Sequence, residues 1–411
     1  MTVITDTKTT DTKTTKYGYL DLHRLGLSAA VLMYFLAIIV VNQVPGALAS
    51  GFYYLSILTG MVLFYANRRT FGLRPLVLMA MGAGLLCLIN TYVVGNNTEV
   101  RSAIMTASFF VAALMLDEEV DERTYLVAMY LNAMVVLAKV ALHGTKAPVY
   151  AGSSNNYVSI HLLVPIILYY SLLDARGKKI PLVHSCVVWV LCLMAGGRGG
   201  LLAATILVAG VILRLYLADE ATRRDRVKLG FLLVLIMIPV LIVLLKMMTE
   251  YLSDLYVIDR FMNKGLDGGG RIACWTEYLQ SLGNSTKNVL FGTRLDNLWW
   301  VRHYNGNLHN SFLFVHAGMG IIGFVTFLFL LVRAMVWAIR NKTGVYLACI
   351  LTMCFRGLTD HMFGGNRMTA IIIAMILLPD FIMQERKRKE KRAAEQERRL
   401  VKHAYSGSYT G

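Results

Sequence analysis

Long apolar runs, separated by short polar stretches, organise almost the whole chain. A membrane-spanning helix needs about 20 mostly apolar residues, and this length predicts about twelve spans. The predicted spans cover residues 25–44, 48–66, 75–94, 100–116, 124–143, 157–174, 181–196, 199–217, 229–248, 310–333, 344–359 and 368–384. The pattern therefore predicts an all-α polytopic membrane protein.

Positive charge is distributed unevenly between the apolar runs. Clusters of Lys and Arg lie at residues 68–74, 176–179, 223–228 and 333–342 and in the C-terminal tail. With the N-terminus inside, all of these clusters face the cytoplasm, as is typical of the Lys and Arg residues in the loops of membrane proteins. We therefore expect an even number of spans, with both termini in the cytoplasm.

The two ends of the chain are polar. Residues 1–24 contain the tandem repeat TDTKTTDTKTTK and are expected to form a disordered cytoplasmic N-terminus. Residues 385–411 form a basic cytoplasmic tail that mixes Lys and Arg with Glu. We expect this tail to continue the last helix along the inner membrane surface, attracted by anionic membrane lipids.

The composition agrees with this picture and excludes other classes. Hydrophobic residues make up 56% of the 411 residues and charged residues only 16%, unlike the composition of a soluble domain. The net charge of +16 lies in short loops and the tail, so it reflects topology and does not indicate a nucleic-acid partner. Because no Cys or His spacing suggests zinc, we expect no metal and no other cofactor.

One loop is much longer than the others. Residues 249–309 separate the spans of 25–248 from those of 310–384 and lie on the extracytoplasmic side in the predicted topology. Apolar residues recur at helical spacing in this loop, as in helices that lie at a membrane interface. Long loops are usually functional. We therefore expect a large helical loop that carries binding or catalytic groups.

Two arginines on the outer side stand at glycine-flanked helix starts. Arg198 lies in GGRGG before the span that begins at residue 199, and Arg271 follows GGG at the start of an amphipathic helix. The free N–H groups and dipole of a helix start attract anions, and two guanidinium groups suit a pyrophosphate. The alternatives are a tight turn with a snorkelling Arg198 and a solvent-facing Arg271.

A histidine stands at the start of the tenth predicted span. His309 precedes Asn310, which is an acceptable helix cap. A helix N-terminus disfavours imidazolium, so a neutral His309 suits a general base acting on a sugar hydroxyl. The alternative is a headgroup-level histidine without chemistry. Asp360, in the last outer loop, either orients an Arg or a His or pairs structurally with Arg356.

Together these residues resemble the bacterial O-antigen polymerase and ligase superfamily, over about residues 180–365. His309-Asn310, nine residues and then Gly320-x-x-Gly323 is similar to the H-[NSQ]-x9-G-x-x-[GTY] pattern of the O-antigen ligases. The Wzy-type polymerases share this pattern loosely.

Further positions extend the resemblance. Arg198 is similar to the family's arginine in a short outer turn, and Arg271 to the arginine that opens the helix of the large loop. Trp275 stands in a typical place, and Asp360 is similar to an aspartate in the last outer loop of the ligases.

The resemblance implies a GT-C-like, metal-independent and inverting glycosyltransferase in the bacterial inner membrane, with a periplasmic active site. Its substrates would be undecaprenyl-pyrophosphate-linked glycans, as donor and as acceptor. By this analogy Arg198 and Arg271 hold the donor pyrophosphate, and His309 deprotonates the acceptor hydroxyl. Trp275, Asn310 and Asp360 complete the substrate-binding set.

The sequence leaves three functions open. We favour a polymerase of lipid-linked repeat units, with a chain-length regulator as a conceivable partner. The alternative is a ligase that transfers the glycan to lipid A-core. A membrane transporter is a third option, because Lys139, His161 and Arg214 place ionisable groups in or near spans.

Overall fold

The chain is represented by a computed structural model. It describes residues 11–43, 73–96, 99–144, 149, 155–217, 270–304, 306–365 and 368–407, together with a few single residues between 51 and 62. Every regular element in this part of the chain is a helix, which confirms the predicted all-α class. The predicted span 229–248 and residues 249–269 of the long loop lie outside the described residues, as does nearly all of span 48–66.

Ten of the predicted spans coincide with described helices. These are α1 (Asp11–Gln43), α3 (Leu73–Val93), α4 (Glu99–Met115), α5 (Arg123–His143), α6 (Asn155–Ala175), α7 (Leu182–Met194), α8 (Arg198–Leu217), α14 (Ser311–Arg340), α15 (Gly344–Thr359) and the first half of α16 (Thr369–Gly407). Six of them are long and apolar enough to cross a membrane, and α4, α7 and α15 are shorter apolar helices. The protein is thus a polytopic membrane protein.

The ends of the chain are more helical than expected. Helix α1 already begins at Asp11, so the prediction of disorder is wrong for residues 11–24, while residues 1–10 lie outside the described part. Once an apolar helix has nucleated, each added turn costs little, so the polar repeat can extend it. Helix α16 runs unbroken from the last apolar run into the basic tail, which confirms that the tail continues this helix.

Helix α6 lies at the centre of the bundle. Residues 158–175 of this helix are all buried inside the protein, unlike the other long helices, which expose much of their surface. It packs against α5, α7, α8, α15 and α16. A helix that is apolar on all sides requires such surroundings. Residues at both ends of α6 consequently reach groups on several neighbouring helices.

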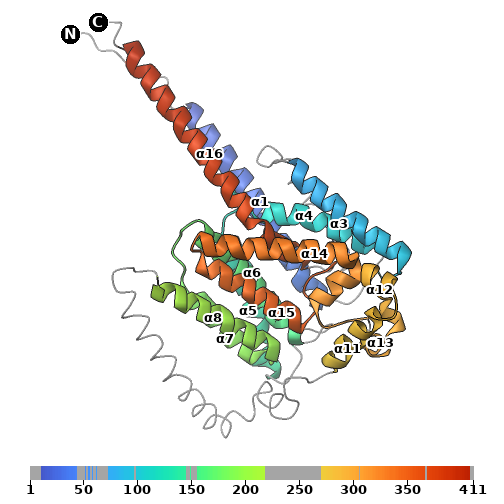
Figure 1. Cartoon of the computed structure of the whole chain (residues 1–411). Coiled ribbons are helices and arrows are strands. Elements are labelled where there is room, and N and C mark those ends of the chain that lie inside the picture. Colours follow the sequence, from blue (N-terminus) through green and yellow to red (C-terminus); the bar gives the residue numbers. More distant parts are fainter. Residues whose placement is uncertain are drawn as a thin grey trace, which may run out of the picture.

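Four short helices of the long loop form a compact layer at one end of the bundle (Figure 1). They are α11 (Arg271–Leu282), α12 (Thr286–Phe291), the 3-10 helix η3 (Leu295–Asn297) and α13 (Trp299–His303). We call residues 270–304 and 306–309 the cap, and its end of the molecule the cap end. The cap has its own apolar core, which includes Tyr278 and Val301 and reaches Phe314 on α14.

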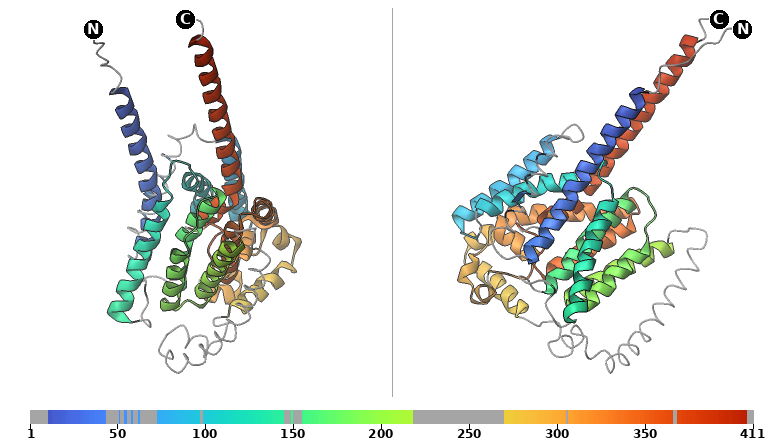
Figure 2. Two further views of the ribbon diagram at one scale, coloured as in Figure 1. Left: turned by 90° about the vertical axis from the view of Figure 1, so that its left-hand side faces the viewer. Right: turned by 180° about the vertical axis from the view of Figure 1, so that it is seen from behind.

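The beginning of α1 and the end of α16 both lie at the opposite end of the molecule, which we call the tail end (Figure 2). Between the two ends the helices run side by side, and α7 and α8 form a hairpin along one flank. The long loop is therefore largely helical where it is described, and it lies far from the start of α1 and the end of α16.

Glycines of α14 attach the cap to the bundle. Gly320 has a φ of 65° and interrupts the helical geometry of α14, and a Cβ at this position would lie 2.3 Å from the Leu290 carbonyl oxygen of α12. Gly292 also has a positive φ, and its Cβ would lie 3.0 Å from Ala317 Cα. The absence of a side chain at Gly320 thus allows the cap to pack onto α14.

Candidate active site

The centre of the candidate site is Asp360, which directly follows α15 at the cap end. Its side chain is buried, with Oδ2 3.1 Å from Arg356 Nη2 and Oδ1 3.5 Å from His309 Nδ1. The backbone N–H of His361 also donates to Oδ1, at 2.9 Å. Sequence reasoning set pairing with Arg356 against orientation of an Arg or a His as alternatives. The structure shows that one carboxylate contacts both groups.

Asp360 is ionised in spite of its burial. Burial by itself opposes the charged form, but Arg356, His309 and Arg271 outweigh it and hold the pKa of the Asp360 carboxyl well below its usual range. A carboxylate beside Nδ1 favours the imidazole tautomer that carries its proton on Nδ1. The Nε2 atom of His309 is then the proton acceptor, as a general base requires.

His309 is held in an unusual backbone conformation. Its φ is 49°, in the left-handed region that residues other than glycine rarely adopt. The Oδ1 atom of Asn307 accepts its backbone N–H at 2.8 Å, and the Tyr304 ring packs edge-on at a centroid distance of 5.4 Å. The imidazole keeps 20% of its surface exposed. The imidazole is thus positioned rigidly and is still reachable by a substrate.

Asn310, next to His309, is the N-cap of α14. Its side-chain oxygen accepts the backbone N–H groups of Phe312 and Leu313 at 3.0 and 3.2 Å. The prediction of a helix cap is confirmed. Its predicted contact with substrate stays a prediction, because in this structure the side-chain oxygen serves the helix start.

Arg356 is the buried arginine of the site. It is only 1% exposed and lies in the last turn of α15, where a cation matches the partial negative charge of the helix end. Besides Asp360, it donates to the carbonyl oxygen of Asn156 at 2.8 Å and to Thr359 Oγ1 at 3.1 Å. Arg356 therefore ties the start of the central helix α6 to the carboxylate that faces His309.

Arg198 lies at the start of α8, and this helix start packs against the cluster. It is the first residue of α8 and only 8% exposed, as is unusual for an arginine. A Cβ on Gly199 would lie 3.0 Å from Thr359 Oγ1 and 3.7 Å from Arg356 Nη1, and one on Gly200 would collide with Ser159. The glycines after Arg198 thus allow the helix start to pack closely against α15 and α6.

Arg271 approaches the cluster from the cap. It is the first residue of α11, after Gly270 with a φ of 66°, and is partly buried. Its charge acts on the Asp360 carboxyl. The predicted helix starts at Arg198 and Arg271 are both confirmed, and both lie near the pair of His309 and Asp360. Their binding of a pyrophosphate stays a prediction.

Trp275 acts within the cap. Its indole N–H donates to the carbonyl oxygen of Leu308 at 2.8 Å, and its ring packs against the core of the cap. This contact fixes the residue directly before His309. A substrate contact of Trp275 stays a prediction, whereas its role in positioning His309 follows from the hydrogen bond.

Sequence reasoning missed Ser311 and a row of aromatic side chains. The Ser311 hydroxyl donates to the Asp360 carbonyl oxygen at 2.8 Å and accepts the backbone N–H of Met362 at 2.7 Å, so it joins the start of α14 to the last loop. Trp299, His303, Tyr304 and His309 follow one another in ring contacts, with Trp299 55% exposed. In the sequence, the i,i+4 spacing of Trp299 and His303 was the available signal for this row, because it places the two rings on one helix face.

The neighbouring His361 differs sharply from His309. Its ring lies tilted against Phe314 at a centroid distance of 3.8 Å, and burial, together with the charge of Arg101, lowers the pKa of His361 to about 3. His361 is therefore neutral at working pH and cannot exchange protons readily. Of the two histidines beside Asp360, His309 is the one suited to proton transfer.

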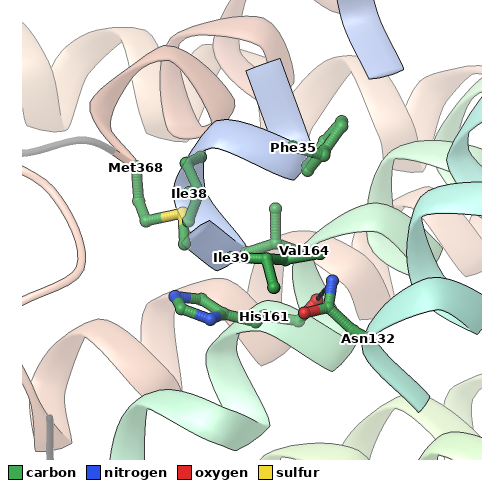
Figure 3. A pocket seen from close by; sticks show the side chains of 7 residues that line it. All are labelled: Phe35, Ile38, Ile39, Asn132, His161, Val164 and Met368. Atoms are coloured by element: carbon green, nitrogen blue, oxygen red, sulfur yellow. Dashed lines mark hydrogen bonds between the residues drawn. The ribbon is translucent and has the colours of Figure 1, made fainter. Parts of the chain in front are cut away.

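The residues that suggested a transporter have other surroundings. His161 lines a small pocket with Asn132 and five apolar side chains, which leaves no room for a water molecule (Figure 3). Arg214 lies at the tail end, with its Nε atom 3.8 Å from Asp174 Oδ1. Lys139 is half-buried on α5. These three residues do not gather into one pocket.

Comparison with known protein families finds a match to part of the chain. Residues 185–328 match the Wzy_C family, described as O-antigen ligase. The matched segment contains Arg198, Arg271, Trp275, His309 and Asn310 and ends before Asp360. None of the curated proteins compared with the chain matches it. This match is consistent with the O-antigen polymerase and ligase superfamily and, together with the apolar helices, indicates a membrane-embedded polysaccharide-assembly enzyme.

Proposed function

We propose that this protein polymerises undecaprenyl-pyrophosphate-linked oligosaccharide repeat units into a surface polysaccharide at the outer face of the bacterial inner membrane. The observation that carries the proposal is the pair of His309 and the ionised Asp360, 3.5 Å apart, with two arginine-bearing helix starts beside it. A proton acceptor next to anion-binding groups suits attack by a hydroxyl on a pyrophosphate-activated sugar.

In the proposed reaction His309 Nε2 takes the proton from the acceptor hydroxyl while the oxygen forms a bond to the anomeric carbon of the donor. The bond from that carbon to the pyrophosphate oxygen breaks, and undecaprenyl pyrophosphate leaves from the opposite face, so the configuration inverts. Asp360 stabilises the imidazolium that forms. The proton then passes from His309 to solvent.

Arg198 and Arg271 would stabilise the charge that develops on the leaving pyrophosphate. A guanidinium stays protonated at any working pH and presents several donors in a fixed plane, so it can bind pyrophosphate without a metal ion. Their places at the starts of α8 and α11 add the partial positive charge of two helix N-termini. This arrangement supports a metal-independent reaction.

The second candidate function is an O-antigen ligase, which would use the same chemistry with lipid A-core as acceptor. The match of residues 185–328 to the O-antigen ligase family favours it. Purified protein should be incubated with a lipid-linked repeat unit alone and with lipid A-core. A ladder from the lipid-linked unit alone supports the polymerase, product only with core supports the ligase, and no glycan transfer in either reaction contradicts both.

We further propose that the cap faces the periplasm and that both termini lie in the cytoplasm. The start of α1 and the end of α16 lie together at the tail end, opposite the cap (Figure 2), which supports this orientation. Single cysteines at exposed Thr286 and Glu395, in a cysteine-free protein, would be labelled from opposite sides of the membrane. Labelling of both from one side would contradict the orientation.

A further inference from the structure

A second charged cavity lies at the tail end, remote from the candidate active site. It has a volume of about 310 Å³ and lies where the end of α6, the end of α8, the turn between α14 and α15, and α16 come together. Five cationic side chains line it, against two carboxylates: Arg176, Arg214, Lys342, Arg386 and Lys389, with Asp174 and Glu385. The lining therefore carries an excess of positive charge.

Both carboxylates of this cavity are already engaged. Asp174 is buried, and its Oδ2 atom accepts the backbone N–H groups of Val345 and Tyr346 at 2.9 and 3.0 Å, at the start of α15. Its other oxygen faces Arg214 at 3.8 Å. Asp174 thus neutralises part of the positive helix start and does not compensate the more distant cations.

Glu385 is shared in the same way. It lies 3.3 Å from Arg176 Nε and 2.7 Å from Lys389 Nζ. Burial opposes its ionisation, but Lys389 and Arg176 lower the pKa of the Glu385 carboxyl below its usual value. Two of the five cations are therefore satisfied by this one carboxylate, which is ionised at neutral pH.

Lys342 and Arg386 are the cations left over. Within the described part of the chain neither lies within ion-pair distance of a carboxylate, and the contact of Arg386 is to Asn341 Oδ1 at 3.4 Å. Lys342 has a φ of 55° in the tight turn between α14 and α15, so this turn holds it at the cavity. The adjacent N-cap residue of α15, Thr343, makes no side-chain capping bond.

We propose that this cavity binds the phosphate group of an anionic membrane lipid. Two uncompensated cations and a cavity large enough for a headgroup form an anion site of suitable size and sign. A lipid is the expected source of the phosphate because the cavity lies where apolar helices end and Ile382 forms part of its wall. The alternative is that these residues only orient the chain in the membrane.

The test is lipid retention measured by native mass spectrometry on the full-length protein, purified from membranes with mixed phosphatidylglycerol and phosphatidylethanolamine. The probe variant is Lys342→Asn with Arg386→Gln, since asparagine tolerates a positive φ. The control variant is Arg340→Gln with Lys387→Asn, which removes the same charge from exposed positions on α14 and α16 outside the cavity. Elution of both variants as folded monodisperse protein is checked first.

The probe variant should retain phosphatidylglycerol about tenfold less than the parent, and the control variant should match the parent. Use of Arg386→Lys in place of Arg386→Gln in the probe variant keeps the charge at this position. This change should restore most of the lipid retention. Equal retention by probe and control variants, or equal binding of both lipids, would overturn the proposal. Displacement of the lipid by millimolar inorganic phosphate would show that a soluble phosphate is the ligand and would overturn the lipid assignment.

Discussion

The two ends of helix α15 are built from similar parts and are suited to different tasks. At its start, the buried Asp174 accepts two backbone N–H groups of α15, and cations surround a cavity. At its end, the buried Asp360 pairs with Arg356 and faces His309. Each end combines one buried carboxylate with nearby cations, so composition alone does not distinguish them.

Helix polarity explains the difference. The start of a helix carries partial positive charge, so the Asp174 carboxylate accepts the N–H groups there. The surrounding cations therefore stay available for an anion. The end carries partial negative charge, so Arg356 is stabilised in the last turn and holds Asp360 in its ionised form. One oxygen of Asp360 then remains to orient an imidazole. One end is suited to binding an anion, and the other to proton transfer.

The largest expected effect is on His309. His309→Ala should lower the rate of glycan transfer about a thousandfold, because a positioned general base contributes about 10² to 10⁴ in rate. The measurement is product formation from a lipid-linked repeat unit by purified protein. His303→Ala, an exposed histidine of the same cap, serves as the control and should keep most of the activity. Full activity of the His309 variant would contradict the assignment of His309 as the general base.

Arg356→Met should destabilise the protein by about 3–5 kcal/mol, because it leaves the buried Asp360 carboxylate without its main partner. Arg333→Met is the matched control. Its pair with Asp380 is partly exposed, and the loss should be at most about 1 kcal/mol. Thermal unfolding in detergent measures both. Equal shifts in the two variants would contradict the proposed role of Arg356 as a buried support.

Asp360→Asn should lower kcat about a hundredfold and leave KM for the donor nearly unchanged, because the amide no longer favours the productive tautomer of His309. Combining it with His309→Ala should give little further loss, since the two groups act as a unit. Steady-state kinetics of the single and double variants decide the question. Additive losses in the double variant would mean that Asp360 acts apart from His309.

Trp275→Phe should have a smaller effect. It removes the hydrogen bond to the Leu308 carbonyl oxygen but keeps an aromatic ring in the core of the cap. A lost hydrogen bond costs about 1 kcal/mol, so we expect a fall in rate of about fivefold. If Trp275 acts only by positioning His309, KM for the donor should not change. A rise in KM with unchanged kcat would instead indicate direct substrate contact.

The smallest effect concerns pH. The pKa of Asp360 is lowered in the folded protein, so its stabilisation is fully present above the unfolded value of about 3.9 and is lost only as the pH falls through the folded pKa. The stability difference between the parent and Asp360→Asn should therefore not decrease between pH 8 and pH 5. Thermal unfolding across this range checks it, and a difference that shrinks toward pH 5 would contradict an ionised Asp360.

The regular parts of the fold could be predicted from the sequence. Ten apolar runs became helices because spanning length and hydropathy are local properties of the chain. The starts at Arg198 and Arg271 and the cap at Asn310 were also predictable, since glycines and capping residues mark helix ends. The disorder expected for residues 11–24 was wrong, because composition does not include the influence of an adjoining helix.

The sequence by itself determined the apolar helices and the kinds of residue at their outer ends. Only the tertiary structure decided that Asp360 contacts both Arg356 and His309, that Ser311 joins α14 to the last loop, and that Gly320 receives the cap. Except for the local pair of Arg356 and Asp360, these contacts join segments dozens of residues apart in the chain. Local pattern sets the helix ends, whereas the packing around α6 sets which ends meet, because hydropathy carries no information about pairing between helices.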